Sequence, residues 1–328
     1  MTSHPYSRLT PDLVLAAIDS TGCYTDGRLL PLNSFENRVY QAGQEEGPPL
    51  IAKFYRPERW SDAAILEEHA FALALAEDEI PAVPPLQIQH QTLFHYEGYR
   101  FALFRRQGGR TPEFDDPAVL EWLGRFLARI HDVGARSAYQ CRLPLDRAHF
   151  GDAAQASVLA SGLLPPELVS PYRDISTAAL AAIDACWQRA GQPATLRLHG
   201  DCHPGNLLWT DGGPHFVDLD DSCTGPAVQD LWMLLGGERQ EMSQKLGDLL
   251  AGYEQIRDFD LRELHLIEAL RSLRMIHHAA WLARRWDDPA FPPAFPWFNT
   301  HAYWQEHIGA LQEQLERMNE APLWSATY

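Results

Sequence analysis

Three polar residues in a fixed order constrain this chain more than any other feature. Asp201 is followed five residues later by Asn206, and twelve residues after that by Asp218. Two short apolar runs lie between Asn206 and Asp218, on either side of the turn sequence Asp-Gly-Gly-Pro at residues 211–214. Such a pattern predicts two antiparallel strands joined by a tight turn. The hairpin would place Asn206 and Asp218 nearly opposite one another at its open end.

The chemistry of these residues favours a magnesium site. Two hard oxygen ligands suit Mg²⁺ bridging nucleotide phosphates better than they suit zinc. In phosphoryl-transferring enzymes, an Asp accepts the proton of the acceptor hydroxyl, and an Asn and a second Asp bind the metal, in this order. We therefore predict catalytic roles for Asp201 and Asp218, with Asn206 and Asp218 as metal ligands. In the competing interpretation they are ordinary turn and strand-capping residues, which the ordered set of three argues against.

A second group of candidate residues lies upstream of Asp201, around Lys53. The apolar run at residues 50–55 is interrupted by Lys53, as in strands whose lysine contacts the α- and β-phosphates of a nucleotide. A helix is expected to follow within residues 61–81. Glu68 interrupts the apolar face of that helix, and an unpaired buried acid is costly, so we predict that it pairs with Lys53. Glu67 is the alternative partner, and both glutamates can also simply solvate the helix.

The loop that would cover the phosphates is unusual. Neither G-x-G-x-x-G nor G-x-x-x-x-G-K-[ST] precedes the lysine strand. The candidate segment is residues 32–40, which lacks glycine. Such a loop would have to offer Ser and Asn side chains and backbone N–H groups to the phosphate oxygens.

Taken together, these motifs resemble the aminoglycoside phosphotransferase and choline kinase branch of the protein-kinase-like superfamily. More narrowly, the chain is similar to the bacterial stress response kinase A family, the Cpx/Rdo-type Ser/Thr protein kinases. The segments that carry the resemblance span nearly the whole chain: residues 31–40, 53–60, 196–203, 225–235, 284–292 and 295–297. The resemblance implies an α+β, bilobal protein-kinase-like fold of the aminoglycoside phosphotransferase type. It also implies that Asp201 accepts the proton, that Asn206 and Asp218 hold magnesium, and that Ser34 contacts ATP.

Some positions depart from the eukaryotic protein-kinase pattern. Gly200 stands where the Arg of H-R-D would be, and only eleven residues separate Asp218 from Asp230. A long activation segment is therefore not expected, and neither is control by its phosphorylation. Asp230 resembles the buried Asp of the superfamily that accepts hydrogen bonds from the catalytic-loop backbone. Asp220 and Asp221 are candidates for a second magnesium, or solvated acids of the turn.

The expected lobes follow from a change of pattern along the chain. The pattern of residues 92–104 predicts a hairpin, so we assign residues 1–104 to a small β-rich N-lobe. Residues 105–109 are the predicted hinge, whose backbone would contact adenine. Residues 110–328 form a large, mainly helical C-lobe with the catalytic loop and the metal-binding hairpin. Its first helix shows an apolar stripe at helical spacing: Leu120, Leu123, Leu127 and Ile130.

Composition excludes several classes of partner. The formal net charge of −17 disfavours binding to nucleic acid and to anionic membranes. No signal peptide and no apolar run of ~20 residues is recognised.

The five cysteines are widely spaced and lack a paired C-x-x-C, which is typical of reduced thiols in the cytoplasm. We expect a cytoplasmic monomer, in which Cys202 and His203 support the loop beside Asp201 rather than act chemically.

The predicted function is ATP- and magnesium-dependent transfer of the γ-phosphoryl group to an alcohol, as in a Ser/Thr protein kinase. The nucleotide would be bound by Ser34, Lys53 and Glu68. One alternative is a small-molecule kinase acting on an amino sugar, a choline-like amine or a homoserine-like alcohol, which the short span after Asp218 favours. Another is a nucleotide-binding pseudokinase scaffold, but such a protein has no need of the base Asp201.

Overall fold

The computed structural model describes residues 4–323, which divide into two compact units. The first, called here the sheet unit, comprises residues 4–112, 139–142 and 204–222. The second, called here the helical unit, comprises residues 113–138, 143–203 and 223–323. The sheet unit is thus assembled from three separate segments of the chain. The predicted lobe boundaries at residues 104 and 109 remain a prediction.

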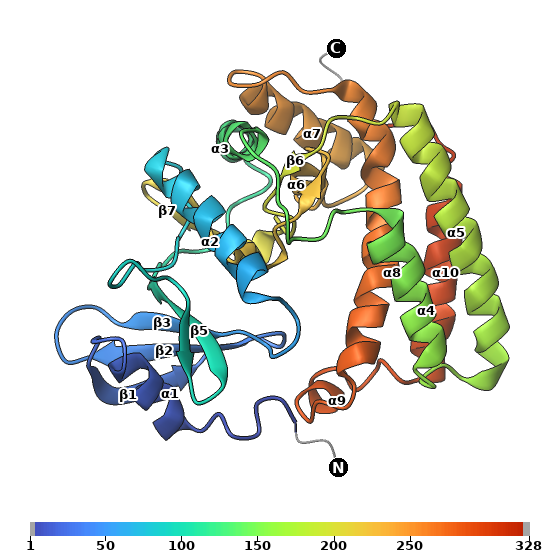
Figure 1. Ribbon diagram of the computed structural model, residues 1–328. Helices are drawn as coiled ribbons and strands as arrows, with labels where there is room; N and C mark the ends of the chain where they lie inside the picture. The colour runs from blue at the N-terminus through green and yellow to red at the C-terminus, as the bar shows by residue number, and fades with distance from the viewer. Residues whose placement is uncertain (1–3, 324–328) are drawn as a thin grey trace. The chain divides into compact units, whose positions relative to one another are not determined.

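An antiparallel sheet of five strands, in the order β1-β2-β3-β5-β4, forms the centre of the sheet unit (Figure 1). The strands are β1 (Thr25–Pro31), β2 (Arg38–Gln44), β3 (Leu50–Phe54), β4 (Phe94–Tyr96) and β5 (Tyr99–Arg105). The middle strand β3 is the predicted lysine strand, and Ala52 and Phe54 are fully buried in it. Pairing of Val39 and Ala102 with Lys53 fixes the position of this lysine in the sheet.

Two helices belong to the sheet unit, α1 (Pro11–Asp19) and α2 (Asp62–Glu77). Helix α2 starts at the predicted signal, because the side chain of Ser61 accepts a hydrogen bond from the amide of Ala64. Its inward face is apolar apart from Glu68 and His69: Ala64, Ile65, Phe71, Ala72 and Leu75 are buried. Glu68 therefore lies inside the unit, as its place in the stripe predicts.

The predicted hairpin is present as β7 (Leu207–Thr210) and β8 (Gly213–Phe216), preceded by the 3₁₀ turn η3 (Pro204–Asn206) and followed by η4 (Leu219–Asp221). Gly213 adopts a φ of +108°, which L residues rarely adopt, at the tight turn. The amide of Val83 donates to the carbonyl of Phe216 (3.0 Å), and the amide of Arg110 donates to that of Trp209 (2.9 Å). These bonds attach the hairpin to the sheet unit.

Helices make up most of the helical unit. They are α3 (Pro117–Ala135), α4 (Ala153–Ala160), α5 (Val169–Ala190), α6 (Gln229–Trp232), α7 (Arg239–Tyr253), α8 (Ile267–Arg285), α9 (Phe291–Ala294) and α10 (His301–Arg317). Shorter elements are η1 (Ala148–Asp152), η2 (Pro166–Leu168), η5 (Leu261–Leu266) and the strand pair β6 (Leu196–Arg197) and β9 (Thr224–Gly225). Helices α4, α5, α8 and α10 lie side by side (Figure 1).

The predicted stripe of α3 is buried throughout, from Leu120 to Ile130. Helix α3 packs closely on α7, and two glycines make this possible. A Cβ at Gly124 would lie 2.0 Å from the carbonyl oxygen of Leu249, and one at Gly252 would lie 1.9 Å from that of Glu121. Any larger residue at either position would force the two helices apart.

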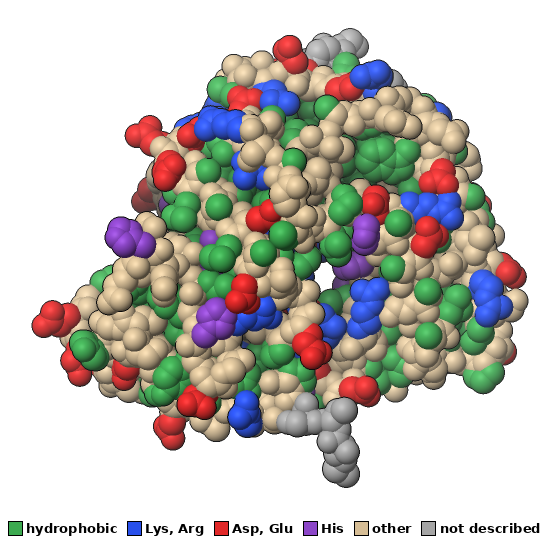
Figure 2. Space-filling view, in the orientation of Figure 1, with side chains coloured by type: hydrophobic (Ala, Val, Ile, Leu, Met, Phe, Trp, Pro, Cys, Tyr) green, Lys and Arg blue, Asp and Glu red, His purple; other side chains and the backbone are tan. Residues whose placement is uncertain are grey.

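No helix within residues 4–323 is both long and apolar enough to cross a membrane. On the face drawn in Figure 2, acidic side chains lie scattered among basic and apolar ones. The net charge of −17 is therefore not gathered into one patch on this face.

Candidate functional site

A cavity of about 370 Å³ lies within the sheet unit. Such a volume is in the range of pockets that bind small molecules. Part of its wall is apolar and is formed by Val39, Ile51, Ala72, Val83, Phe104 and Leu208, among other residues. The same cavity is lined by five of the residues predicted to act on a nucleotide or a metal: Ser34, Lys53, Glu68, Asn206 and Asp218. One site thus collects residues that are up to 184 positions apart in the chain (218 − 34).

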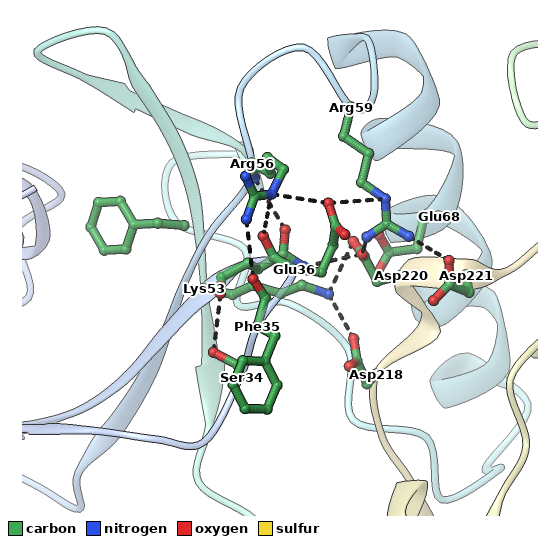
Figure 3. A network of polar contacts seen from close by, with 12 residues as sticks. Ser34, Phe35, Glu36, Lys53, Arg56, Arg59, Glu68, Asp218, Asp220 and Asp221 are labelled. Carbon is green, nitrogen blue, oxygen red and sulfur yellow. Dashed lines mark hydrogen bonds and ion pairs between the residues drawn. The ribbon is translucent and has the colours of Figure 1, made fainter. Parts of the chain in front are cut away.

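Lys53 contacts two acids of the turn after the hairpin (Figure 3). Its Nζ lies 2.8 Å from Oδ1 of Asp218 and 3.2 Å from Oδ1 of Asp220. Only 7% of the lysine side chain is exposed. Burial alone would lower the pKa of Lys53, but Asp218, Asp220 and Glu68 hold that pKa well above its usual value. Lys53 therefore remains a cation.

The expected ion pair between Lys53 and Glu68 is not among the contacts of residues 4–323, which corrects that prediction. Glu68 pairs instead with Arg142, whose Nη2 lies 3.1 Å from Oε2 of the glutamate. Glu67, the alternative partner, also points elsewhere, since it accepts the backbone amides of residues 140–142. Lys53 thus contacts Asp218 and Asp220 rather than Glu68, and the buried Arg142 pairs with Glu68.

Asp220 is buried, with 3% of its surface exposed, so it is not a solvated acid of the turn. Its carboxylate accepts a hydrogen bond from Nδ2 of Asn37 (3.0 Å) and pairs with Arg59 as well as with Lys53. Burial would raise the pKa of Asp220, but Arg59, Lys53 and Arg142 together hold it well below its usual range. Both carboxylate oxygens thus face protein cations or donors, which disfavours a second magnesium there.

The glycine-free loop is held together by its own side chains. The hydroxyl of Ser34 accepts the amide of Val39 and donates to the carbonyl of Asn37, both at 3.1 Å. Arg56 Nε lies 3.2 Å from Oε1 of Glu36 (Figure 3). Hydrogen bonds and ion pairs therefore do here what glycines do in other phosphate loops, which is to define a tight backbone path.

The hairpin brings its two candidate metal ligands together, as predicted. Leu207 pairs with Phe216, and the amide of Val217 donates to the carbonyl of Asn206 at 3.1 Å. Asp218 follows directly with a φ of +61°, a conformation that Asp tolerates better than most residues. Residues 4–323 contain no group of three or more His, Cys, Asp or Glu side chains suited to a metal. An Asn and an Asp nevertheless fit Mg²⁺, which commonly takes its other ligands from water and substrate phosphates.

Asp201 belongs to the helical unit, whereas the other predicted residues belong to the sheet unit. The backbone before it is fixed by Asp230, which is fully buried. Asp230 accepts the amides of His199 and Gly200, both at 2.8 Å, and this confirms its predicted structural role. Gly200, directly before Asp201, has a φ of +87°, a conformation that glycine adopts readily and arginine rarely does.

The carboxylate of Asp201 faces two cationic or titratable side chains. It pairs with Arg274 of α8, and Nε2 of His203 lies 3.4 Å from its Oδ2. Burial would raise the pKa of Asp201, but His203 and Arg274 hold it well below its usual range, so the carboxylate stays ionised. Cys202 is fully buried, and burial raises the pKa of its thiol well above its usual value. Its thiol is therefore a poor nucleophile.

Glu68 makes the stability of the protein depend on pH. Burial raises the pKa of Glu68 from 4.5 to about 7, against the opposing effect of Lys53 and Arg142. The folded chain therefore holds this proton more tightly than the unfolded chain, and the stabilisation present below about pH 4.5 is lost as the pH rises to about 7. We expect the free energy of unfolding of the native protein to fall, relative to that of Glu68→Gln, across this window. Urea denaturation of both proteins at about pH 5 and about pH 7.5 measures this, and a constant difference would contradict it.

Sequence comparison relates the chain to known enzymes. Residues 28–267 match the phosphotransferase enzyme family. Stress response kinase A of Salmonella choleraesuis (strain SC-B67) is 43% identical over 318 residues, which cover 97% of this chain and 96% of that protein. Serine/threonine protein kinase RdoA of Salmonella typhimurium and stress response kinase A of Escherichia coli (strain K12) are each 42% identical with the same coverage.

Solved structures of low sequence identity share the fold. An amicoumacin kinase in complex with AMP-PNP and Ca²⁺ has a TM-score of 0.71 at 19% identity, covering 93% of both chains. A spectinomycin phosphotransferase in complex with ADP and spectinomycin has a TM-score of 0.60 at 15% identity, covering 92% of this chain and 98% of the other. The predicted fold, a β-rich N-terminal part and a mainly helical C-terminal part, is thereby confirmed.

Proposed function

Because this chain belongs to the phosphotransferase enzyme family, and within it to the stress response kinase A family, we propose that it is a Ser/Thr protein kinase. It would transfer the γ-phosphoryl group of ATP to a serine or threonine hydroxyl. The observation that carries the proposal is the polar end of the cavity, where Lys53, Asn206 and Asp218 all line one space. A cation and two oxygen ligands are the groups that a magnesium–triphosphate complex needs.

The cavity suggests how the nucleotide would lie. The adenine ring would occupy the apolar part, next to Ile51 and Phe104, where Arg105 and Gln107 of the predicted hinge also line the cavity. The triphosphate would then extend to Lys53 and the Ser34 loop. Magnesium, held by Asn206 and Asp218, would neutralise charge on the phosphates. Bound AMP-PNP in the amicoumacin kinase and bound ADP in the spectinomycin phosphotransferase support a nucleotide as the ligand.

Lys53 would change partners when the nucleotide binds. Its Nζ now contacts both Asp218 and Asp220. Phosphate oxygens would take the place of Asp218, which frees that carboxylate for the metal, while Asp220 keeps the lysine in position. Asp220 is suited to this because it is buried and its pKa is held low, so it remains an anion.

Asp201 would orient the acceptor hydroxyl and accept its proton. An ionised carboxylate is required for this role, and Arg274 and His203 keep Asp201 ionised.

A small-molecule kinase is the second candidate. The short span from Asp218 to Asp230 favours it, since that span holds no peptide-docking segment, and the names of the structural relatives describe kinases of small molecules.

Autophosphorylation separates the two candidates. We expect the purified protein to acquire phosphate on Ser or Thr when incubated with ATP and magnesium, because a protein kinase without a partner commonly uses its own hydroxyls as acceptors. Intact-mass spectrometry and phosphopeptide mapping measure this, and Asp201→Asn is the negative control. If neither this protein nor a generic protein acceptor gains phosphate, while a pool of metabolites supports rapid ATP consumption, the small-molecule candidate is correct instead.

A further inference from the structure

Residues 139–142, called here the clasp, belong to the sheet unit although the chain on both sides of them belongs to the helical unit. The clasp binds α2 through its backbone. The amides of residues 140, 141 and 142 donate to the carboxylate of Glu67 at 2.7, 2.9 and 3.1 Å. Three consecutive donors on one carboxylate make a charge-assisted contact of the strong kind.

The first residue of the clasp extends these contacts to the turn that follows the hairpin. The hydroxyl of Tyr139 lies 2.6 Å from Oγ of Ser222, directly after η4. Its ring meets that of Phe71 on α2 edge to face, with the centroids 6.1 Å apart. The clasp therefore contacts both the helix that carries Glu68 and the turn that follows Asp218.

Arg142, the last residue of the clasp, joins these two elements directly. Its side chain is fully buried, and its guanidinium lies 4.4 Å from the ring centroid of Trp60. Nη2 pairs with Glu68 at 3.1 Å, and Nη1 donates to the carbonyl of Asp220 at 2.7 Å. The two contacts come from two different nitrogens of the planar guanidinium, an arrangement that the single nitrogen of a lysine does not reproduce.

These contacts explain the distribution of charges at the cavity. Arg142 pairs with Glu68, and Lys53 contacts Asp218 and Asp220 rather than the glutamate. Asp220, whose backbone Arg142 holds, supplies the second partner of the lysine instead. Arg142 itself does not line the cavity, and it acts on the nucleotide site through Glu68 and Asp220.

We propose that the clasp, through Arg142, is a built-in positioning device for the phosphotransfer site, and that it fixes α2 and the Asp218 turn before any nucleotide binds. In protein kinases the corresponding helix is set in place by a phosphorylated activation segment. Here the eleven residues between Asp218 and Asp230 leave no such segment, and an unmodified stretch of chain takes over the task. The inference rests on the proposed function, but its test measures ATP binding and does not require a phosphate acceptor.

The decisive variant is Arg142→Lys, which keeps the positive charge but replaces the two nitrogens that contact Glu68 and the Asp220 carbonyl by a single one. We expect the KM for ATP to rise, and magnesium-dependent ATP binding to weaken, by about 10-fold, the usual effect of losing one charged hydrogen bond. Calorimetric titration with an ATP analogue at several magnesium concentrations measures the binding. Arg28→Lys is the control, because Arg28 is an arginine of the same unit that pairs with Asp26, and neither residue lines the cavity.

Two further variants keep the proposal open to refutation. Glu68→Gln combined with Arg142→Lys should give less than the product of the two separate effects, since the residues act as one unit. Tyr139→Phe removes the hydroxyl that contacts Ser222 and should weaken magnesium-dependent binding as well, so it tests the proposal if Arg142→Lys does not fold.

The outcomes are distinguishable. A folded Arg142→Lys protein, or a folded Tyr139→Phe protein in its place, with an unchanged KM for ATP and unchanged magnesium dependence would overturn the positioning role. Lost thermal stability with normal binding in the folded fraction would overturn it as well, because it indicates packing alone. If ATP binding weakens as expected but no protein acceptor is ever phosphorylated, the clasp inference stands and the Ser/Thr assignment fails.

Discussion

Asp201→Asn is expected to lower turnover by about 10²- to 10⁴-fold, the usual effect of losing a general base. Asparagine has nearly the same shape, and its oxygen can still accept a hydrogen bond from Arg274, but it cannot take a proton at neutral pH. ATP binding should be unchanged, because the nucleotide cavity is lined entirely by residues of the sheet unit and Asp201 belongs to the helical unit. Single-turnover kinetics and calorimetry measure the two quantities separately.

The matched control for this variant is Asp211→Asn. Asp211 is an exposed acid in the turn of the β7–β8 hairpin, at the end away from Asn206. The control should leave both turnover and binding near those of the native protein. Near-normal phosphotransfer by a well-folded Asp201→Asn protein would remove Asp201 from the mechanism.

Asp218→Asn should have the second largest effect, and on a different quantity. We expect magnesium-dependent ATP binding to weaken and turnover to fall by roughly two orders of magnitude or more, because a bound metal contributes several kcal/mol to such reactions. Lys53 would keep Asp220 as a partner, so the loss would report on the metal rather than on the lysine. Titration with an ATP analogue over a range of magnesium concentrations measures the effect.

In this experiment the dependence on magnesium is more informative than the affinity itself. A weaker but equally magnesium-dependent interaction would show that Asp218 acts on the nucleotide without holding the metal. The Asp211→Asn protein again serves as the control, since it alters the charge of the same hairpin by the same amount.

Sequence patterns predicted the elements whose signals are local. The β7–β8 hairpin follows from a turn sequence between two apolar runs, and the buried face of α3 follows from spacing alone. The burial of Lys53 in a strand and of Glu68 in a helix was predictable for the same reason. Each of these patterns lies within a window of fewer than about 20 residues, where periodicity and turn chemistry decide the outcome.

The charge network was not predictable in this way. Asn37 bonds to Asp220 across 183 positions, and Arg142 bonds to Glu68 across 74. No periodicity links such partners, and nothing in the sequence distinguishes Arg142 from the many arginines that lie on a surface. The Lys53–Glu68 pair was mispredicted for the same reason, since the competing ions come from segments far along the chain. A charged residue at an inward-facing position was the available signal, and it indicated that a partner exists without identifying it.

The division of the sheet unit among three segments affects the order of events during synthesis. Domains usually fold as units, the N-terminal one first, while the chain is still being made. Here the nucleotide cavity needs Asn206 and Asp218, and Lys53 and Glu68 need Asp220 and Arg142. A nascent chain ending before residue 220 has buried positions for these charges but not all of their counterions, which is costly. About two-thirds of the chain must therefore be synthesised before the charges buried among its first hundred residues have all their partners.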